Sequence, residues 1–257
     1  MNLTRNTLYG DGVFESMLLK NNQIALWPYH FQRLTHSLQY LGIHFDLSAA
    51  ALLQILKSHL AQNALNHEPL VRIRLTIYRQ SQGLYLPQTN HFALDITATA
   101  YQPPPPINTI NTINYYTENL KTAHSPLSNH KTTSSALYVL AALYKQQQNL
   151  EEILLLNQHQ RVVEAGSSNI YLIKNNQIRT PSLTEGPING VFRTFLLDNF
   201  PIAETTITQN DLETADEVFT SNAIQGVRPV AHSPLGKPYQ TTQTNKLMGN
   251  IKQILKN

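Results

Sequence analysis

A few side chains in the sequence could take part in chemistry, and each also has a simpler structural interpretation. Lys131 stands in the polar stretch SNHKTTSSA, where its amine could form an imine with a carbonyl compound or move protons. Glu164 lies in RVVEAGSSN and could equally be a turn residue. Arg33 could bind an anion or be one more charge on the outer face of a helix. Taken one at a time, these residues do not decide the function.

Other kinds of site have weaker support. The histidines show no regular metal-ligand spacing, so we assign no metal. Ser167 and Ser168 have no recognisable base partner, which argues against a serine hydrolase. Gly10 and Gly12 lie in YGDG, which matches no nucleotide-binding fingerprint.

The elements that must position these residues follow from hydrophobic periodicity. Val71–Arg79 alternates strictly and predicts a half-buried strand whose polar face carries Arg72 and Arg74. The other expected elements are a helix over His30–Leu41, a helix over Ala49–Gln62 capped by Ser48, strands over Phe92–Ala100, Ile110–Tyr116 and Glu152–Asn157, a helix over Thr132–Gln147, a hairpin through Ile170–Ile178 that turns at Asn175-Asn176, and a helix after Gly190.

The order of these elements predicts an α+β protein with two domains. Strands and helices are mixed without regular alternation, which favours α+β over a doubly wound fold. The uninterrupted proline run Pro103–Pro106 cannot lie inside a helix or a central strand. We therefore expect an N-terminal domain over residues 1–106 and a C-terminal domain over residues 107–257 that carries Lys131.

Composition narrows the class of partner. With 257 residues, 41% hydrophobic and 14% charged, the chain is large enough and apolar enough to bury a core. The net charge of +3 comes from scattered basic residues, which suits a small anionic molecule better than nucleic acid. No apolar run is long enough to span a membrane, and the N-terminus lacks the apolar core of a signal peptide. Together with the absence of cysteine, this predicts a cytoplasmic protein.

Six segments that follow one another along the chain give stronger support for a functional role than any single residue does. They are YGDGVFES (Tyr9–Ser16), YHFQRL (Tyr29–Leu34), HKTTSSALYVLA (His130–Ala141), EAGSSNIYLI (Glu164–Ile173), GPINGVFR (Gly186–Arg193) and ADEVFTSNAIQGVRPV (Ala215–Val230). This series resembles the class IV aminotransferases, which are enzymes of fold type IV that use pyridoxal 5′-phosphate (PLP). The family holds branched-chain aminotransferases, D-amino acid aminotransferases and aminodeoxychorismate lyases.

The resemblance implies a role for each matching position. Lys131 corresponds to the lysine that binds PLP as a Schiff base, and Glu164 to the glutamate that meets the pyridine nitrogen. Arg33 corresponds to the arginine that contacts the phosphate. The remaining matches to the phosphate site are the backbone N–H groups of Val191 and Phe192, together with Asn222 and Ala223. The implied fold has two domains with PLP between them, usually in a homodimer whose partner subunit helps to line the substrate pocket.

Within the family, two segments favour the aminodeoxychorismate lyases, which make 4-aminobenzoate and pyruvate for folate synthesis. YGDGVFES is similar to the lyase segment, although Ser16 replaces its common threonine, and Asn222 and Ala223 stand where transaminases usually carry glycine and threonine. Arg72, Arg74 and Arg79 are then candidates for binding the substrate carboxylates, or they are exposed strand residues. The alternatives are a transaminase acting on branched-chain or D-amino acids and a non-catalytic PLP-binding scaffold.

Overall fold

The computed structural model describes residues 3–102 and 109–255, and the chain divides into two compact units. The first is Met1–Pro103 with His130–Ser135, and the second is Pro104–Asn129 with Ala136–Asn257. The sequence placed Lys131 in the C-terminal domain, whereas the structure groups its segment with the N-terminal unit. The run Pro103–Pro106, on which the boundary after residue 106 was predicted, lies outside the described residues.

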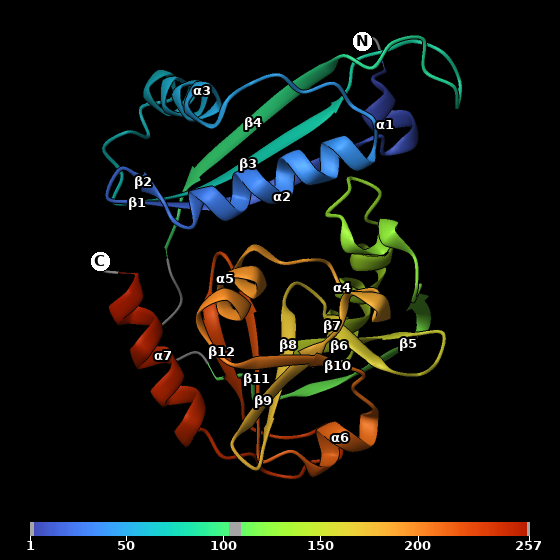
Figure 1. Ribbon diagram of the computed structural model, residues 1–257, viewed down its shortest axis with the longest axis vertical. Coiled ribbons are helices and arrows are strands. Elements are labelled where there is room, and N and C mark those ends of the chain that lie inside the picture. The colour runs from blue at the N-terminus through green and yellow to red at the C-terminus, as the bar shows by residue number, and fades with distance from the viewer. Residues whose placement is uncertain (1–2, 103–108, 256–257) are drawn as a thin grey trace. The chain divides into compact units, whose positions relative to one another are not determined.

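The first unit is an antiparallel sheet in the order β2-β1-β3-β4, with two long helices on one face (Figure 1). Its elements are α1 (Arg5–Tyr9), β1 (Gly12–Lys20), β2 (Gln23–Ile24), α2 (Trp27–Tyr40), α3 (Ala49–Gln62), β3 (Leu70–Arg79) and β4 (Phe92–Ala100). Because side chains alternate between the faces of a strand, one face of this sheet is apolar and the other carries polar groups.

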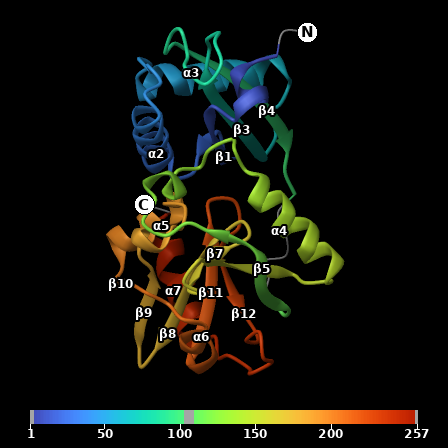
Figure 2. The same ribbon diagram turned by 90° about the vertical axis from the view of Figure 1, so that its right-hand side faces the viewer.

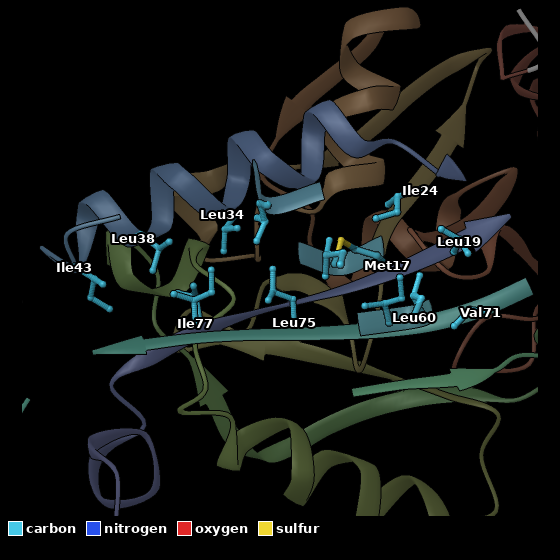
Figure 3. Packing of buried hydrophobic residues seen from close by; sticks show 14 residues of the cluster. Met17, Leu19, Ile24, Leu34, Leu38, Ile43, Leu60, Val71, Leu75 and Ile77 are labelled. Carbon is cyan, nitrogen blue, oxygen red and sulfur yellow. The ribbon is translucent and has the colours of Figure 1, made fainter. Parts of the chain in front are cut away.

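The apolar face forms the core of this unit. Figure 3 shows Leu34 and Leu38 of α2 pointing toward Leu75 and Ile77 of β3. These four side chains are almost fully buried. The predicted alternation is confirmed from Val71 to Ile77 and leaves Arg72 and Arg74 exposed on the opposite face of β3, whereas Tyr78 and Arg79 at the end of the strand are both buried.

The helices of this unit begin where local signals allow. α3 begins after Ser48, whose hydroxyl accepts a hydrogen bond from the N–H of Ala51 at 3.2 Å, as predicted. α2 begins at Trp27, earlier than the expected His30, because Pro28 is accepted in the first turn of a helix.

The second unit contains two sheets with helices around them. One sheet has the order β5-β6-β7, and the other has the order β10-β9-β8-β11-β12. Its elements are β5 (Ile113–Lys121), α4 (Ala136–Gln147), β6 (Glu152–Asn157), β7 (Val162–Ala165), β8 (Asn169–Lys174), β9 (Gln177–Pro181), α5 (Val191–Asn199), β10 (Ile202–Thr205), α6 (Gln209–Thr214), β11 (Glu217–Asn222), β12 (Gly226–Val230) and α7 (Thr242–Ile254), with 3₁₀ turns at Pro126–Asn129 and Leu183–Glu185. The α+β class is confirmed.

Two predictions for this unit need correction, whereas the strand over Glu152–Asn157, the helix after Gly190 and the hairpin are confirmed. The strand expected over Ile110–Tyr116 is β5, which begins and ends later because Ile110 makes only an isolated bridge to β12. The helix expected over Thr132–Gln147 is α4, which begins at Ala136 and lies beside β5 (Figure 2). The hairpin of β8 and β9 turns at Asn175 and Asn176, as predicted. Both residues adopt the left-handed conformation, with φ of 51° and 64°.

Within residues 3–102 and 109–255, no helix is long and apolar enough to cross a membrane. In the same ranges, no group of three or more histidine, aspartate or glutamate side chains is placed to hold a metal ion.

Candidate active site

Lys131 is held by backbone pairing at the edge of the first unit's sheet. The N–H of Phe14 donates to the carbonyl of Lys131 at 3.0 Å, and the N–H of Thr133 donates to the carbonyl of Gly12 at 2.9 Å. A Cβ on Gly12 would lie 2.7 Å from the carbonyl oxygen of Ile77, so only glycine fits this position. These bonds explain why the segment around Lys131 belongs to the first unit.

The polar face of this sheet gathers cations beside Lys131. The Nζ of Lys131 lies 4.3 Å from the centroid of the Phe14 ring, and the Cζ of Arg74 lies 3.7 Å from the same centroid. Such cation–π contacts contribute roughly 0.5–1 kcal/mol at exposed sites. Partial burial, with the like charge of Arg72, lowers the pKa of Arg74. An anion bound here would relieve that repulsion, so this face can accept an anionic group close to Lys131.

Arg79 differs from the other two candidate arginines because its donors are already used. Its Nε donates to Asp11 at 3.0 Å, and its Nη2 donates to the carbonyl of Leu41 at 2.6 Å. Its Nη1 donates to the carbonyl of Gly42 at 3.0 Å and to Asn90. Arg79 is buried in this network, so we assign it a structural role and leave it out of the proposed substrate site.

Arg33 is oriented by a buried carboxylate. Its Nε and Nη2 donate to the two oxygens of Glu15 at 2.7 and 2.5 Å, and Nδ1 of His30 lies 2.6 Å from Oε2 of the same group. Burial alone would raise the pKa of Glu15, but the charge of Arg33 and the bonds to His30 and Arg33 outweigh it and lower that pKa to about 2. The Nη1 of Arg33 takes no part in these bonds and can donate to another anion.

The low pKa of Glu15 predicts a pH-dependent contribution to stability. A carboxyl whose pKa is lower in the folded state stabilises the protein above its unfolded pKa of 4.5, and the contribution is lost as pH falls toward 2. We expect Glu15→Gln to lower the free energy of unfolding near pH 6 by on the order of 2–3 kcal/mol, with the difference from wild type shrinking in acid.

Denaturant unfolding between pH 6 and pH 3 measures this difference. The exposed Glu118→Gln change is the control and should have little effect at any pH. A Glu15→Gln penalty that stayed constant across this range would contradict the ionic role of Glu15.

Glu164 is a buried strand residue of β7 rather than a turn residue. Its Oε1 accepts a hydrogen bond from the hydroxyl of Tyr138 at 2.7 Å and lies 3.0 Å from the Nζ of Lys121. Its Oε2 accepts a bond from the N–H of Ile188 at 2.9 Å. An ionised carboxylate offers about four acceptor positions, so Oε2 has room for one more donor.

The first turn of α5 provides N–H donors in the same unit. Its N-cap residue, Gly190, has no side chain that could accept a hydrogen bond from the first turn. The N–H groups of Val191 and Phe192 lie in that turn, where no carbonyl of the same helix can accept from them. A Cβ on Gly190 would lie 1.9 Å from Oδ1 of Asn169, which makes glycine necessary there. Unpaired N–H groups and the helix dipole together favour an anion such as phosphate at this end.

The turn between β11 and β12 carries the last predicted phosphate residues. Oδ1 of Asn222 accepts bonds from the N–H groups of Ile224 and Gln225 at 3.0 and 2.7 Å, and its Nδ2 donates to Oγ of Ser168 at 2.9 Å. The side chain of Asn222 therefore shapes the turn, and a phosphate contact from this segment would come from the backbone around Ala223. β11 packs against α5, so both groups belong to one part of the second unit.

Comparison with known proteins identifies the family. The sequence pattern of the amino-transferase class IV family matches residues 12–232, which is most of the chain. The chain belongs to the class IV aminotransferase family. It is therefore an enzyme of a PLP-dependent family, and fold type IV is its fold.

Relatives of this class IV aminotransferase family member carry different activities. It is 26% identical over 97% of its length to a putative branched-chain-amino-acid aminotransferase of Methanocaldococcus jannaschii, of which 87% is covered. It is 26% identical over 89% of its length to a D-alanine aminotransferase of Listeria monocytogenes, of which 80% is covered. A solved 4-amino-4-deoxychorismate lyase from Pseudomonas aeruginosa has a TM-score of 0.81 and 25% identity, with 98% and 95% of the two chains covered.

The residues of this family member fit PLP. In the second unit, Glu164 presents an acceptor position suited to a protonated ring nitrogen, and the start of α5 presents donors suited to a phosphate. In the first unit, Lys131 presents an amine. When bound, PLP supplies an electron-accepting ring that stabilises negative charge formed next to the substrate nitrogen. The residues named here would then hold the ring, and an amine such as that of Lys131 could move protons.

The sequence did not predict four residues that contact the candidate site residues Arg33 and Glu164. Glu15 carried a signal, because it is a charged residue at an inward position of a strand between Val13 and Met17. Its partner His30 carried none of its own. Lys121 and Tyr138 gave no local signal, since only the folded chain brings them to Glu164.

Proposed function

We propose that this chain is an aminodeoxychorismate lyase that holds PLP on Lys131 and forms 4-aminobenzoate and pyruvate. In this proposal, Glu164 keeps the ring nitrogen protonated. Arg33, the N–H groups of Val191 and Phe192, and the turn at Asn222 and Ala223 hold the phosphate.

The observation that carries the choice of substrate is the pair of exposed arginines on the same sheet face as Lys131. Aminodeoxychorismate has two carboxylates, and Arg72 and Arg74 provide two forks of donors that suit such groups. Lys131 would remove the proton from the ring carbon next to the amine and return a proton to the departing enol. The two products together contain all the atoms of aminodeoxychorismate, so no second substrate is needed to accept the amino group.

The transaminase alternative has its own support. The relatives from Methanocaldococcus jannaschii and Listeria monocytogenes are aminotransferases with about the same identity to this chain as the lyase has. Both reactions begin with removal of a proton beside the substrate nitrogen, so Lys131 and Glu164 serve either one. The reactions differ in stoichiometry, because a transaminase needs a second substrate to receive the amino group.

A direct comparison of the two reactions tests the proposal. We expect the purified protein loaded with PLP to release pyruvate and 4-aminobenzoate in equal amounts from aminodeoxychorismate alone, much faster than it transaminates any L- or D-amino acid with 2-oxoglutarate. Sustained transamination without lyase turnover would reject the lyase proposal in favour of the aminotransferase.

The substrate arginines are tested in the same assay. We expect Arg74→Met to raise the KM for aminodeoxychorismate by roughly tenfold or more, because a charge-assisted bond of about 1.5–3 kcal/mol is lost. Lys20→Met removes an exposed cation from the end of β1 and is the control. An unchanged KM in Arg74→Met would remove this residue from the substrate site.

We also propose that the enzyme works in the cytoplasm as a homodimer. The support for a second copy is an apolar exposed surface on α4 formed by Val139, Leu140 and Leu143, in a unit whose other large apolar residues are mostly buried. Sedimentation analysis tests the dimer, and Leu140→Glu should shift it toward the monomer.

A further inference from the structure

A lysine that the proposed chemistry does not use is buried against Glu164. The Nζ of Lys121 donates to the hydroxyl of Tyr138 at 2.7 Å and to the carbonyl of Ser128 at 3.2 Å, and it lies 3.0 Å from Oε1 of Glu164. The ammonium group therefore makes two hydrogen bonds and one ion pair. A lysine this deeply buried is rare unless it is paired, so the arrangement is built around the carboxylate.

Tyr138 completes the group. Its hydroxyl accepts from Lys121 and donates to Oε1 of Glu164 at 2.7 Å. Burial and the neighbouring charge of Glu164 raise the pKa of Tyr138 well above its ordinary value, so the hydroxyl remains a donor. The groups that face the Glu164 carboxylate are then Lys121 from β5, Tyr138 from α4 and the N–H of Ile188.

The two oxygens of the Glu164 carboxylate therefore have different partners. Oε1 is occupied by Lys121 and Tyr138, whereas Oε2 has one partner, the N–H of Ile188. We propose that Lys121 and Tyr138 are positioning residues that hold Glu164 as a carboxylate and direct Oε2 to the ring nitrogen of PLP. This inference rests on the proposed role of Glu164 as the partner of that nitrogen.

The charge of Lys121 decides where a shared proton resides. A proton between Glu164 and the ring nitrogen can lie on either one. The positive charge of Lys121 is in direct contact with the carboxylate and attracts its negative charge strongly. The ring nitrogen is farther away, so its protonated form is repelled less, and the shared proton is favoured on the nitrogen. The result is a protonated ring nitrogen and a stronger electron sink.

The same geometry argues against Lys121 as the lysine that bonds PLP. The ring nitrogen and the carbon that carries the aldehyde lie on opposite sides of the pyridine ring. A lysine in contact with the carboxylate at the nitrogen is therefore on the wrong side of the ring to reach the aldehyde. Lys121 acts on the cofactor through Glu164 alone.

The first test uses the protein without PLP. In protein with ¹³C-labelled glutamate carboxyls, Glu164→Gln assigns the Glu164 resonance. At pH 7 we expect this resonance in Lys121→Met to move from the carboxylate position toward that of the protonated acid. Lys121→Arg should restore the carboxylate position, and the surface change Lys145→Met is the control. An unmoved resonance in Lys121→Met would overturn the proposal.

The second test uses the loaded enzyme. With ¹⁵N-labelled PLP, we expect the ring nitrogen signal of Lys121→Met to shift toward the unprotonated form, with kcat lower by roughly tenfold or more and KM little changed. Tyr138→Phe should shift it in the same direction to a smaller extent. A protonated ring nitrogen in Lys121→Met would contradict the inference.

Failure of the proposed function gives a different pattern. If Glu164 does not meet PLP, the ¹³C resonance still responds to Lys121→Met, but the ¹⁵N signal is insensitive to both Lys121→Met and Glu164→Gln. If PLP is bonded to Lys121 itself, Lys121→Met loses covalent PLP, which overturns both the inference and the role of Lys131.

Discussion

Replacing Lys131 with alanine is expected to abolish turnover and to remove the visible absorbance of lysine-bound PLP. The alanine side chain can neither bond the cofactor nor move protons, and loss of the proton-transfer function alone lowers the rate by roughly a hundred- to ten-thousand-fold. The fold should survive, because the segment is held by backbone bonds to β1 that do not involve the amine. Absorbance spectra and turnover assays of the purified variant measure both effects.

Lys145→Ala is the matched control for this variant. Lys145 lies at the end of α4, where its amine donates a long bond of 3.4 Å to the carbonyl of Glu151. We expect this variant to keep its colour and its turnover. If Lys131→Ala retained lysine-bound PLP, Lys131 would not be the lysine that holds the cofactor.

Replacing Glu164 with glutamine is expected to leave PLP bound and to slow turnover by about a hundred- to thousand-fold, which corresponds to about 3–4 kcal/mol of transition-state stabilisation. Glutamine is a neutral partner, so the protonated ring nitrogen loses its charge-assisted hydrogen bond and the ring becomes a weaker electron sink. Occupancy should persist through the proposed phosphate contacts of Arg33 and the start of α5. Single-turnover kinetics with PLP content measured in parallel separate the two effects.

Glu152→Gln is the matched control, because Glu152 is another buried glutamate in the same three-stranded sheet. Oε1 of Glu152 accepts a hydrogen bond from the N–H of Ile153 at 2.9 Å, and the amide oxygen of glutamine can accept the same bond, so we expect a near-normal rate. A near-normal rate in Glu164→Gln at full occupancy would show that Glu164 has no part in the chemistry.

The fold was predictable where the pattern is local. The alternation in residues 71–79 predicted a strand with one apolar face, and Ser48 predicted the start of a helix, because both depend only on neighbouring residues. The left-handed turn at Asn175 and Asn176 follows from the tolerance of asparagine for positive φ. These elements carry the scaffold of both units.

The site was predictable only in part, because its geometry depends on distant pairing. The segment around Lys131 was expected to begin a helix, and no local pattern shows that its backbone pairs instead with β1. In the same way, Arg79 lies in the same strand as Arg74, but only the folded structure shows that its donors are used by Asp11 and its neighbours. The contact of Lys121 with Glu164 likewise arises only on folding.

Borohydride reduction of the PLP-loaded enzyme, followed by peptide mapping, tests the central claim most directly. Reduction fixes the cofactor permanently on the lysine that carries it. We expect one pyridoxyl group per chain, on the peptide that contains Lys131. A pyridoxyl group on Lys121 or Lys145, or no labelled peptide, would contradict the account.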